Sequence, residues 1–566
     1  MSKKILSLTD KVWEIADETP SFENLNELIR VILKNRGIED VEAFKCLSLR
    51  NSMPDPFVFV DMEKAVARIV AAIIAGEKIA ILGDYDVDGI SSTVLFMNFF
   101  EYLKVPFTYS IPNRMEEGYG LSIENLKKHK NHLVVAVDCG SSSFDELKYA
   151  QEEKIDVVVI DHHKMESIPE AIAIVNPHRP DESVNFKDLC AAAMVFMCIV
   201  GINRELRNKG FYKDKDLKEP NLLEYLDLVA LATICDVMPL VGINRAFVIN
   251  GIKTMRRRKN LGIDALISQN KTSDVTSDTI AFSFGPKINA AGRLASADLS
   301  VQLLSTKNPI EAKKIAQQLD DLNKERQALE RKIIKEAIQQ IDEDANFICA
   351  HSKKWHVGIV GIVAGRLKET YHKPSLVIAI DENGQGRGSC RSIPQVDISV
   401  IINKAIQKGI VASGGGHSMA AGFCIEEDKI PAFIEFLQNE IKYEKSCEEL
   451  SADCYLAADM AISLETTKEI SAIGPFGNGN KHPKFVIPNL IIAQARIVGK
   501  NHIRLRLSDL KKGVSLDAIS FRSDGTTLGN ILLNHKDPIQ VLGTLSVSEW
   551  NGKKSICFIL EDVAKG

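Results

Sequence analysis

Short apolar runs that end in an acidic residue recur three times in the first half of this chain. They are residues 78–84 (KIAILGD), 132–138 (HLVVAVD) and 156–161 (DVVVID), and a fourth apolar run, 171–177 (AIAIVNP), follows them. Buried β-branched strands that alternate with helices are typical of a parallel sheet with helices on both faces. The pattern predicts an α/β fold, and ligands of such folds collect at the carboxyl ends of the strands.

The hydrophobic pattern divides the 566 residues into five regions. Apolar positions at near-heptad spacing among charged residues predict a long helix between two α/β lobes, with a coiled-coil dimer as the alternative. Short strand-like runs separated by polar turns predict a C-terminal β-barrel. The expected regions are an N-terminal helical region 1–75, a first α/β lobe 76–307, a linker helix 308–344, a glycine-rich second α/β lobe 345–447, and a barrel 448–566.

The composition restricts the expected cellular location of the protein and the ligands that it can bind. Hydrophobic residues make up 45% and charged residues 26%, as in globular proteins, and no apolar run is long enough to span a membrane. The 11 cysteines form no CxxC pair, which argues against a structural zinc site and favours reduced, buried thiols. We therefore expect a cytoplasmic protein. The net charge of −5 leaves nucleic-acid binding to local basic surfaces.

Four aspartates and one histidine lie where the predicted loops can bring them together. They are Asp86, Asp88, Asp138, His162 and Asp236. Carboxylates crowded this closely repel one another, and two divalent cations would neutralise them and clamp a phosphoryl group. The oxygen-rich set suits Mn²⁺ or Mg²⁺ better than zinc. A single aspartate at one of these positions would be interpreted as part of a strand-end turn or as a helix cap. The whole set, in contrast, predicts a metal site.

These residues stand in motifs that resemble a known family. Segments 83–89 (GDYDVDG), 137–140 (VDCG), 161–163 (DHH) and 234–240 (ICDVMPL) resemble, in order and spacing, the four motifs of DHH phosphoesterases. The resemblance extends from about residue 50 to the C-terminus and fits the RecJ-type exonucleases of that family. The longer motifs that carry it are IPNRMEEGYGL, GPKINAAGRL, WHVGIVGIVAGRL, SGGGHSMAAGF and GPFGNGN.

The resemblance implies roles for the acidic motifs. Asp86, Asp88, Asp138, His162 and Asp236 would be metal ligands, and Asp84 would be a ligand or lie just behind one. Asp161 would orient the neighbouring imidazole. His163 would face the scissile phosphate, the alternative being a packed strand-end histidine. The resemblance also implies a second lobe of the DHHA1 type and a barrel of the OB type.

A further set of residues is expected to hold phosphate or DNA. Arginine grips phosphate through two donors, and serine adds a neutral one. The resemblance implies that Arg114, Arg293, Ser389 and Arg391 hold a 5′-terminal phosphate, assisted by Asn289. For each arginine the alternative is a solvated surface position. The glycine-rich segment with Gly414, Gly415, Gly416 and His417 is expected to be a loop that opens a helix, where backbone N–H groups bind an anion; the alternative is a structural turn.

The predicted barrel carries one basic strand. His502, Arg504 and Arg506 alternate with apolar residues in segment 500–507 (KNHIRLRL). Period-two alternation puts the basic side chains on one face and the apolar ones in a core. A barrel with one basic face fits an OB-fold that follows a single-stranded backbone, and the alternative is a solvated edge strand.

The sequence thus predicts a 5′→3′ exonuclease that hydrolyses single-stranded DNA to 5′-mononucleotides in recombination and repair. The polarity comes from the resemblance alone. We expect a monomer whose partners include a single-strand-binding protein and a helicase, with no membrane partner. The rivals are a DHH phosphodiesterase for short oligonucleotides, a non-catalytic DHH scaffold, and a plain single-strand-binding protein. The intact acidic set argues against the last two.

Overall fold

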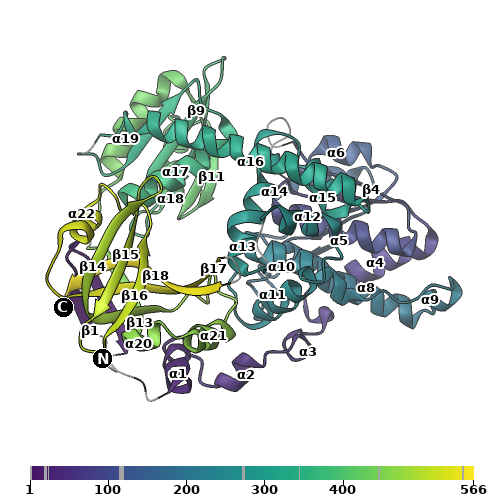
Figure 1. Ribbon diagram of the computed structural model, residues 1–566. Coiled ribbons are helices and arrows are strands. Elements are labelled where there is room, and N and C mark those ends of the chain that lie inside the picture. Colours follow the sequence, from purple (N-terminus) through teal and green to yellow (C-terminus); the bar gives the residue numbers. More distant parts are fainter. Residues whose placement is uncertain are drawn as a thin grey trace. The chain divides into compact units, whose positions relative to one another are not determined.

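The computed structural model describes residues 3–17, 22, 24–113, 120–270, 274–342, 344–443, 447–550 and 553–566 (Figure 1). The chain forms two compact units. The first unit combines residues 1–53, 239–246 and 445–566, and the second combines 54–238 and 247–444. Among the described residues, no helix has the length and apolar character needed to cross a bilayer.

A five-stranded parallel sheet forms the core of the first α/β lobe. All its pairings are parallel, in the order β4-β3-β5-β6-β7. The four apolar runs are four of these strands, which confirms the predicted parallel sheet. The strands are β3 (Ile79–Leu82), β4 (Phe107–Ser110), β5 (Leu133–Val137), β6 (Val157–Ile160) and β7 (Ala173–Val175).

Helices cover both faces of this sheet. Alternate strand residues, such as Ala80, Leu82 and Val134, pack with Leu126 and Leu147 of two short helices on one face. Longer helices contact the strands from the other face. These helices are α6 (Ile123–Lys128) and α7 (Phe144–Glu152) on the first face, and α4 (Met62–Ala75), α5 (Val87–Leu103) and α8 (Ala191–Asn208) on the second.

Further helices follow this sheet, among them a 30-residue helix, α16 (Pro309–Ile338), which confirms the predicted long helix. Its buried apolar residues, among them Ile315 and Leu319, pack against α12, α14, α15 and α17 of the same unit. The apolar face of α16 that a coiled-coil dimer would need is therefore buried against other helices of the same chain. The other helices are α10 (Leu226–Cys235), α11 (Gly242–Met255), α12 (Leu261–Gln269), α14 (Gly285–Leu294), α15 (Asp298–Ser305) and, after α16, α17 (Val357–Tyr371).

The second α/β lobe contains a five-stranded mixed sheet in the order β11-β12-β10-β9-β8. Its glycine run is β11, an exposed edge strand paired antiparallel with β12. The expectation that this run is a loop opening a helix is therefore wrong, because its backbone groups bond to a neighbouring strand. The strands are β8 (Ile348–Ser352), β9 (Ser375–Ile380), β10 (Gln385–Arg391), β11 (Ser413–His417) and β12 (Ala420–Glu426), with α18 (Ile398–Gln407) and α19 (Ile430–Glu440) on one face.

The other unit is built on an eight-stranded sheet, of which β14, β15, β16, β18 and β17 close into a barrel through the β14–β17 pairing. The predicted barrel is confirmed. The prediction of helices throughout residues 1–75 is wrong for residues 3–17, which form two strands that extend this sheet. The strands are β1 (Lys3–Leu6), β2 (Val12–Asp17), β13 (Glu449–Tyr455), β14 (Lys484–Val498), β15 (His502–Asp509), β16 (Val514–Ser520), β17 (Ile539–Trp550) and β18 (Lys553–Lys565).

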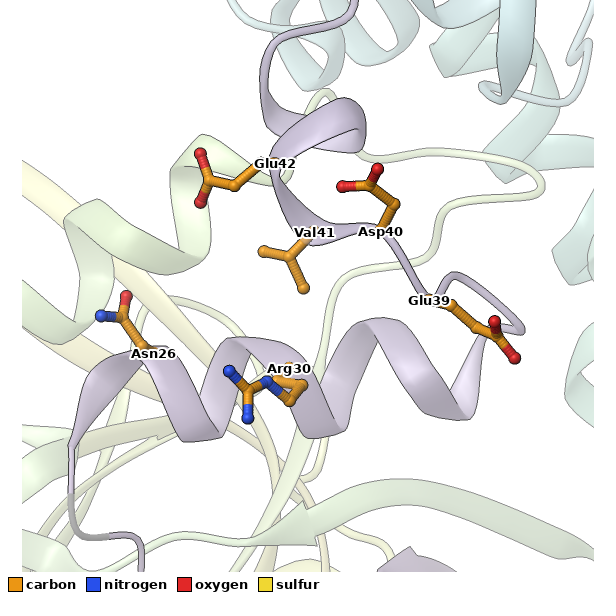
Figure 2. A pocket seen from close by; sticks show the side chains of 6 residues that line it. All are labelled: Asn26, Arg30, Glu39, Asp40, Val41 and Glu42. Carbon is orange, nitrogen blue, oxygen red and sulfur yellow. The ribbon is translucent and has the colours of Figure 1, made fainter.

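A hollow of about 530 Å³ lies in this unit beside helices α1 (Leu25–Asn35) and α2 (Val41–Lys45). Figure 2 shows Val41 directed toward α1, on which Asn26 and Arg30 lie. The other residues that line the hollow are the acidic residues Glu39, Asp40 and Glu42. The hollow contains none of the residues that the sequence assigns to a site.

Candidate metal centre and substrate surface

The acidic motifs meet at the carboxyl edge of the parallel sheet. Asp84 and Asp86 follow β3, Asp138 follows β5, and Asp161 begins the segment after β6. Asp236 joins them from the C-terminal cap of α10. Within the described part of the chain, three groups of side chains have ligand atoms within 4.8 Å of one another: Asp138, His162 and His163; Asp88, His162 and Asp236; and Asp84, Asp86 and Asp138.

The start of α5 fixes the first two carboxylates. Asp86 caps this helix, and its Oδ1 accepts hydrogen bonds from Asp88 N (2.9 Å) and Gly89 N (3.1 Å). Asp88 is 1% exposed and accepts from the N–H groups of Ala191 (2.7 Å) and Ala192 (2.8 Å), at the start of α8. A Cβ at Gly89 would lie 2.5 Å from the backbone oxygen of Asp84, so only glycine lets the helix approach this closely.

His162 lies at the centre of the carboxylates. Its Nε2 atom is 3.3 Å from Oδ1 of Asp138, 3.6 Å from Oδ2 of Asp88 and 3.6 Å from Oδ2 of Asp236. A neutral imidazole nitrogen binds a metal ion at about the same distance as a carboxylate oxygen does. One cation can therefore contact the imidazole and several carboxylates together.

Asp161 and His163 form a pair beside this cluster. Nδ1 of His163 lies 2.7 Å from Oδ1 of Asp161, which is 1% exposed. Asp161 also accepts from the backbone N–H groups of Ser141 (3.0 Å), His162 (2.7 Å) and His163 (3.1 Å). Although burial raises it, these bonds hold the pKa of Asp161 well below its usual range. Although burial lowers it, the bond to Asp161 raises the pKa of His163 to about 9.

Burial and mutual repulsion disfavour the charged forms of three other carboxylates. Burial, followed by repulsion from neighbouring aspartates, raises the pKa of Asp138 well above its usual range and that of Asp236 to about 8. Burial likewise raises the pKa of Asp88. Oδ2 of Asp236 is buried and accepts no hydrogen bond from the described residues. A buried, crowded set of hard oxygen donors fits divalent cations of the Mn²⁺ or Mg²⁺ kind.

Sequence reasoning missed one residue that supports this site. Asn176 is fully buried, and its Nδ2 donates to Ser141 Oγ (2.7 Å) and to the backbone oxygen of His163 (2.9 Å). It thus holds together the segments after β5 and β6. The available signal was its position at the end of a fourth strand-like run, next to three runs that end in acids.

A series of close contacts joins the acidic cluster to the predicted phosphate residues. A Cβ at Gly292 of α14 would lie 2.8 Å from the backbone oxygen of Tyr85, between two acids of the first motif. Arg293 donates to the backbone oxygen of Gly358 in α17 (3.1 Å). A Cβ at Gly361 of α17 would lie 3.0 Å from Oγ of Ser389. The helices between the two sets of residues are thus in direct contact.

Ser389 and Arg391 lie on the same face of β10, where Nη1 of Arg391 donates to Oγ of Ser389 (3.2 Å). A Cβ at Gly361 would also lie 3.6 Å from Nη2 of Arg391, so both side chains lie against α17. Asn289 is half-buried on α14. Arg114 lies outside the described residues. Trp355, the first residue of the motif WHVGIVGIVAGRL, is 5% exposed and donates from Nε1 to Glu336 (2.7 Å), which makes it a core residue.

The positions next to Ser389 across the sheet are glycines. Ser389 pairs with Gly422 of β12, and Gly422 pairs with Gly415 of β11. A Cβ at Gly415 would meet nothing within 4 Å, and one at Gly422 would reach only Gly388 O at 3.9 Å. His417 is exposed at the end of the same strand. Glycines leave a bare strip of backbone here, which a ligand can approach closely.

The barrel shows the alternation that the sequence predicts for β15. Arg504 and Arg506 are exposed, while Ile503, Leu505 and Leu507 are buried. Arg496 of β14 pairs directly with Arg504, which adds a third guanidinium to this face. His502 lies 5.3 Å from the exposed ring of Phe521, in an edge-to-face arrangement.

Family models match three regions of the chain. The DHH family N-terminal domain matches residues 78–233, the DHHA1 domain matches 344–443, and the RecJ OB domain matches 452–562. The single-stranded-DNA-specific exonuclease RecJ of Salmonella typhimurium is 31% identical over 97% of this chain and 98% of its own length.

Solved structures agree with this likeness. The structure of RecJ from Thermus thermophilus in complex with Mn²⁺ has a TM-score of 0.80 and 26% identity, covering 98% of this chain and 79% of that one. The complex of that protein with Mg²⁺ has a TM-score of 0.74 and 25% identity, covering 98% and 78%. Because the likeness in sequence spans nearly all of both chains, this chain belongs to the RecJ family of DHH phosphoesterases.

Proposed function

We propose that this chain is a metal-dependent exonuclease that hydrolyses single-stranded DNA from its 5′ end to 5′-mononucleotides, in recombination and repair. The relative from Salmonella typhimurium is named for exonuclease action specific to single-stranded DNA. The observation that carries the proposal is the cluster of Asp88, Asp138, His162 and Asp236 around one point at the sheet edge. Metal-dependent phosphodiester hydrolysis uses such a cluster, whereas strand binding alone would be opposed by it.

The proposed ligands are those that the cluster brings together. Asp84, Asp86, Asp88, Asp138, His162 and Asp236 would hold two divalent cations, of which Mn²⁺ and Mg²⁺ are the expected kinds. Such cations supply charge neutralisation, a water of lowered pKa and stabilisation of the phosphoryl oxygens. The N–H groups of Ala191 and Ala192 donate to the Asp88 carboxylate and orient it toward the cluster.

His163 is the residue proposed to act on the scissile phosphodiester. Its side chain is 42% exposed, unlike that of His162 at 11%, so it can reach a substrate. Asp161 holds Nδ1 in a hydrogen bond, which directs Nε2 away from this carboxylate. A protonated ring with a pKa of about 9 can donate a proton from Nε2 to a phosphoryl oxygen or to the leaving oxygen.

End recognition is assigned to the second lobe. Arg293, Ser389 and Arg391, with Arg114 and Asn289, would hold the 5′-terminal phosphate, which only a strand end carries. The bare strip formed by Gly415 and Gly422, with Gly414, Gly416 and His417 of the same edge, would take the adjoining backbone. The contacts from Tyr85 through α14 and α17 support this proposal, because they join Arg293, Ser389 and Arg391 to the first acidic motif.

The barrel is proposed to hold the strand farther from the cut. His502, Arg504 and Arg506 lie on a β-barrel strand with exposed basic side chains, as in folds that follow a single-stranded backbone. We also propose that the enzyme is a cytoplasmic monomer that receives its strand from a single-strand-binding protein or a helicase. Light scattering of the purified chain, with and without DNA, tests the monomer.

The deciding experiment compares 5′-labelled and 3′-labelled single-stranded oligonucleotides in Mn²⁺, Mg²⁺ or EDTA, with the wild type and Asp138→Ala. We expect immediate release of the labelled 5′-mononucleotide, lost with EDTA and with the variant. Strand binding without cleavage in either metal would contradict the enzyme and favour a scaffold. Cleavage restricted to very short oligomers would favour a small-substrate phosphodiesterase instead.

A further inference from the structure

One aromatic side chain near the acidic cluster is exposed to solvent. Phe282 is 81% exposed, whereas Ile280 and Phe284, two residues to either side of it, are fully buried. The three residues stand in a π-helical turn, η3 (Ile280–Phe284), which leads directly into α14. A single exposed apolar side chain is ordinary, but π-helical turns are rare and are frequent at functional sites. The surroundings of Phe282 therefore decide whether its exposure has a function.

The turn that carries Phe282 is fixed on both sides. Ser283 donates from Oγ to Oδ1 of Asn270 (2.6 Å). A Cβ at Gly285, the first residue of α14, would lie 2.6 Å from Sγ of Cys235, so the helix packs closely against the end of α10. A ring on such a rigid support loses little conformational entropy when it binds a ligand.

Helix α14 passes close to two of the acidic motifs. Near its start, Gly285 contacts Cys235 of the fourth motif, and near its end, Gly292 contacts Tyr85 of the first motif. The two contacts are about 10 Å apart along the helix. The helix thus flanks the proposed metal ligands of both motifs, and Phe282 lies just before this stretch of the helix.

Phe282 shares one face of the helix with residues proposed to hold phosphate. In α14, Pro286, Asn289 and Arg293 recur at spacings of three and four residues, and none of them is buried. Phe282 lies four residues before Pro286, so the four side chains form one accessible stripe. The stripe is roughly 15 Å long, with Arg293 at one end and Phe282 at the other. A strand whose 5′-phosphate is held by Arg293 would reach Phe282 only after it has passed the acidic motifs.

We propose that Phe282 stacks on a base of the DNA strand on the 3′ side of the scissile phosphodiester. An aromatic ring can stack on bases of any sequence, because every base has a flat π-face. Stacking also needs no positive charge, which beside the crowded carboxylates would pair with them rather than with the strand. A base that lies on Phe282 has left the stack of a duplex, so the contact favours single strands. This role rests on the proposed exonuclease function, to which it adds a residue that holds the strand beside the cut.

The test measures release of the first nucleotide from 5′-phosphorylated single strands in Mn²⁺, by the full-length wild type and by Phe282→Ala. We expect KM to rise about tenfold in the variant and kcat to change by less than about twofold, because stacking holds the strand and takes no part in the chemistry. Phe282→Trp should restore the wild-type KM, whereas Phe282→Leu, which is apolar but has no ring, should not. Ile310→Ala is the control, because it removes an apolar side chain of the same unit that is 79% exposed.

Strands that carry one abasic nucleotide, moved stepwise from the 5′ end, locate the stacked base. In the wild type, an abasic nucleotide at one position on the 3′ side of the cut should raise KM about tenfold. In Phe282→Ala, the same position should have no further effect, because the two changes remove the same contact.

A KM of Phe282→Ala equal to that of Ile310→Ala would overturn the stacking role. Full restoration by Phe282→Leu, or an abasic effect that persists in Phe282→Ala, would overturn it as well. Light scattering that shows dissociation of the chain on Phe282→Ala, with KM unchanged, would mean that a second copy of the chain covers the ring instead. A wild type that releases no nucleotide from any single strand would overturn the exonuclease itself, and the role of Phe282 with it.

Discussion

The Nδ1 atom of His163 lies 2.7 Å from Oδ1 of Asp161, and this carboxylate is almost fully buried. The pair is positioned beside the acidic cluster, yet only His163 of the two has a substantially exposed side chain. The geometry separates a residue that can reach substrate from the residue that orients it.

His163→Ala should therefore impair catalysis without emptying the metal site. We expect kcat on single-stranded DNA to fall by about 10²–10⁴, the range for loss of a general acid. Binding of Mn²⁺ to the protein without DNA should stay within about twofold, because the other proposed ligands remain. Steady-state kinetics and titration with Mn²⁺ check the two parts, and loss of Mn²⁺ binding would instead make His163 a metal ligand.

Asp138→Asn should stabilise the protein in the absence of metal. The substitution removes one buried charge from a crowded set whose pKa values are raised by burial and mutual repulsion. Asp138 has a φ of +59°, which asparagine adopts readily. We expect thermal unfolding in EDTA to shift upward by a few degrees, about 1 kcal/mol, and the stabilisation by Mn²⁺ to be lost.

Asp10→Asn is the matched control for that prediction, because Asp10 is exposed and has a φ of +60°. It should change neither the unfolding temperature nor the response to Mn²⁺. An Asp138→Asn protein that is less stable than wild type in EDTA would show that the carboxylate forms net favourable contacts without a cation.

Arg391→Met should weaken the preference for a 5′-phosphorylated end. Wild type is expected to degrade a strand with a 5′-phosphate faster than the same strand with a 5′-hydroxyl, and loss of a charged hydrogen bond of about 1.5–3 kcal/mol would reduce this ratio roughly 10- to 100-fold. Arg366→Met, which removes an arginine of α17 paired with Glu330 and Glu369, should leave the ratio intact. Equal ratios in the two variants would place end recognition elsewhere.

The paired change Arg504→Gln and Arg506→Gln should reduce the salt dependence of binding to long single strands. Each phosphate that the protein no longer neutralises lowers the slope of log affinity against log salt concentration by about 0.7 for single strands. Degradation of oligonucleotides too short to reach the barrel should be unaffected. Lys536→Gln, an exposed basic residue outside β15, serves as control, and an unchanged slope in the double variant would mean that these arginines are merely solvated.

Acid should destabilise the first α/β lobe through Asp61. Its side chain accepts from Arg179 (2.6 Å), which is 7% exposed, and from the backbone of Ile174 in β7. Burial raises the pKa of Asp61, but hydrogen bonds from Lys64 and Arg179 lower it below its ordinary value. Because the folded pKa is depressed, this stabilisation is present above the unfolded pKa of about 3.9 and is lost as pH falls through the folded value.

Arg179→Met should reduce that pH dependence, with Lys64 left as a partner of Asp61. It should also destabilise the protein at neutral pH by about 3 kcal/mol, since it removes one partner of a mostly buried ion pair. Denaturant unfolding at a series of pH values measures both effects. Arg204→Met, at an exposed pair with Asp55, should cost no more than about 1 kcal/mol. Equal losses in the two variants would refute the special role of Arg179.

The local pattern of the sequence determined the parallel sheet, the long helix and the barrel strands. Strands β3, β5, β6 and β7 were readable because each is a short β-branched run, and the alternation in β15 identified its buried face without further information. The acidic motifs could be placed at one edge because parallel strands all end there. For these features the information lies within a few consecutive residues.

The tertiary structure alone decided the features that depend on distant partners. Strands β1 and β2 form because Trp13 and Ile15 are buried where β2 pairs with β13, at the other end of the chain. The glycine run is an edge strand because β12 supplies its hydrogen bonds. Likewise, Asn176 and Arg245 act through backbone oxygens that no local pattern reveals. Pairing between residues far apart in sequence follows from the whole fold, whereas periodicity reports only which face of an element is buried.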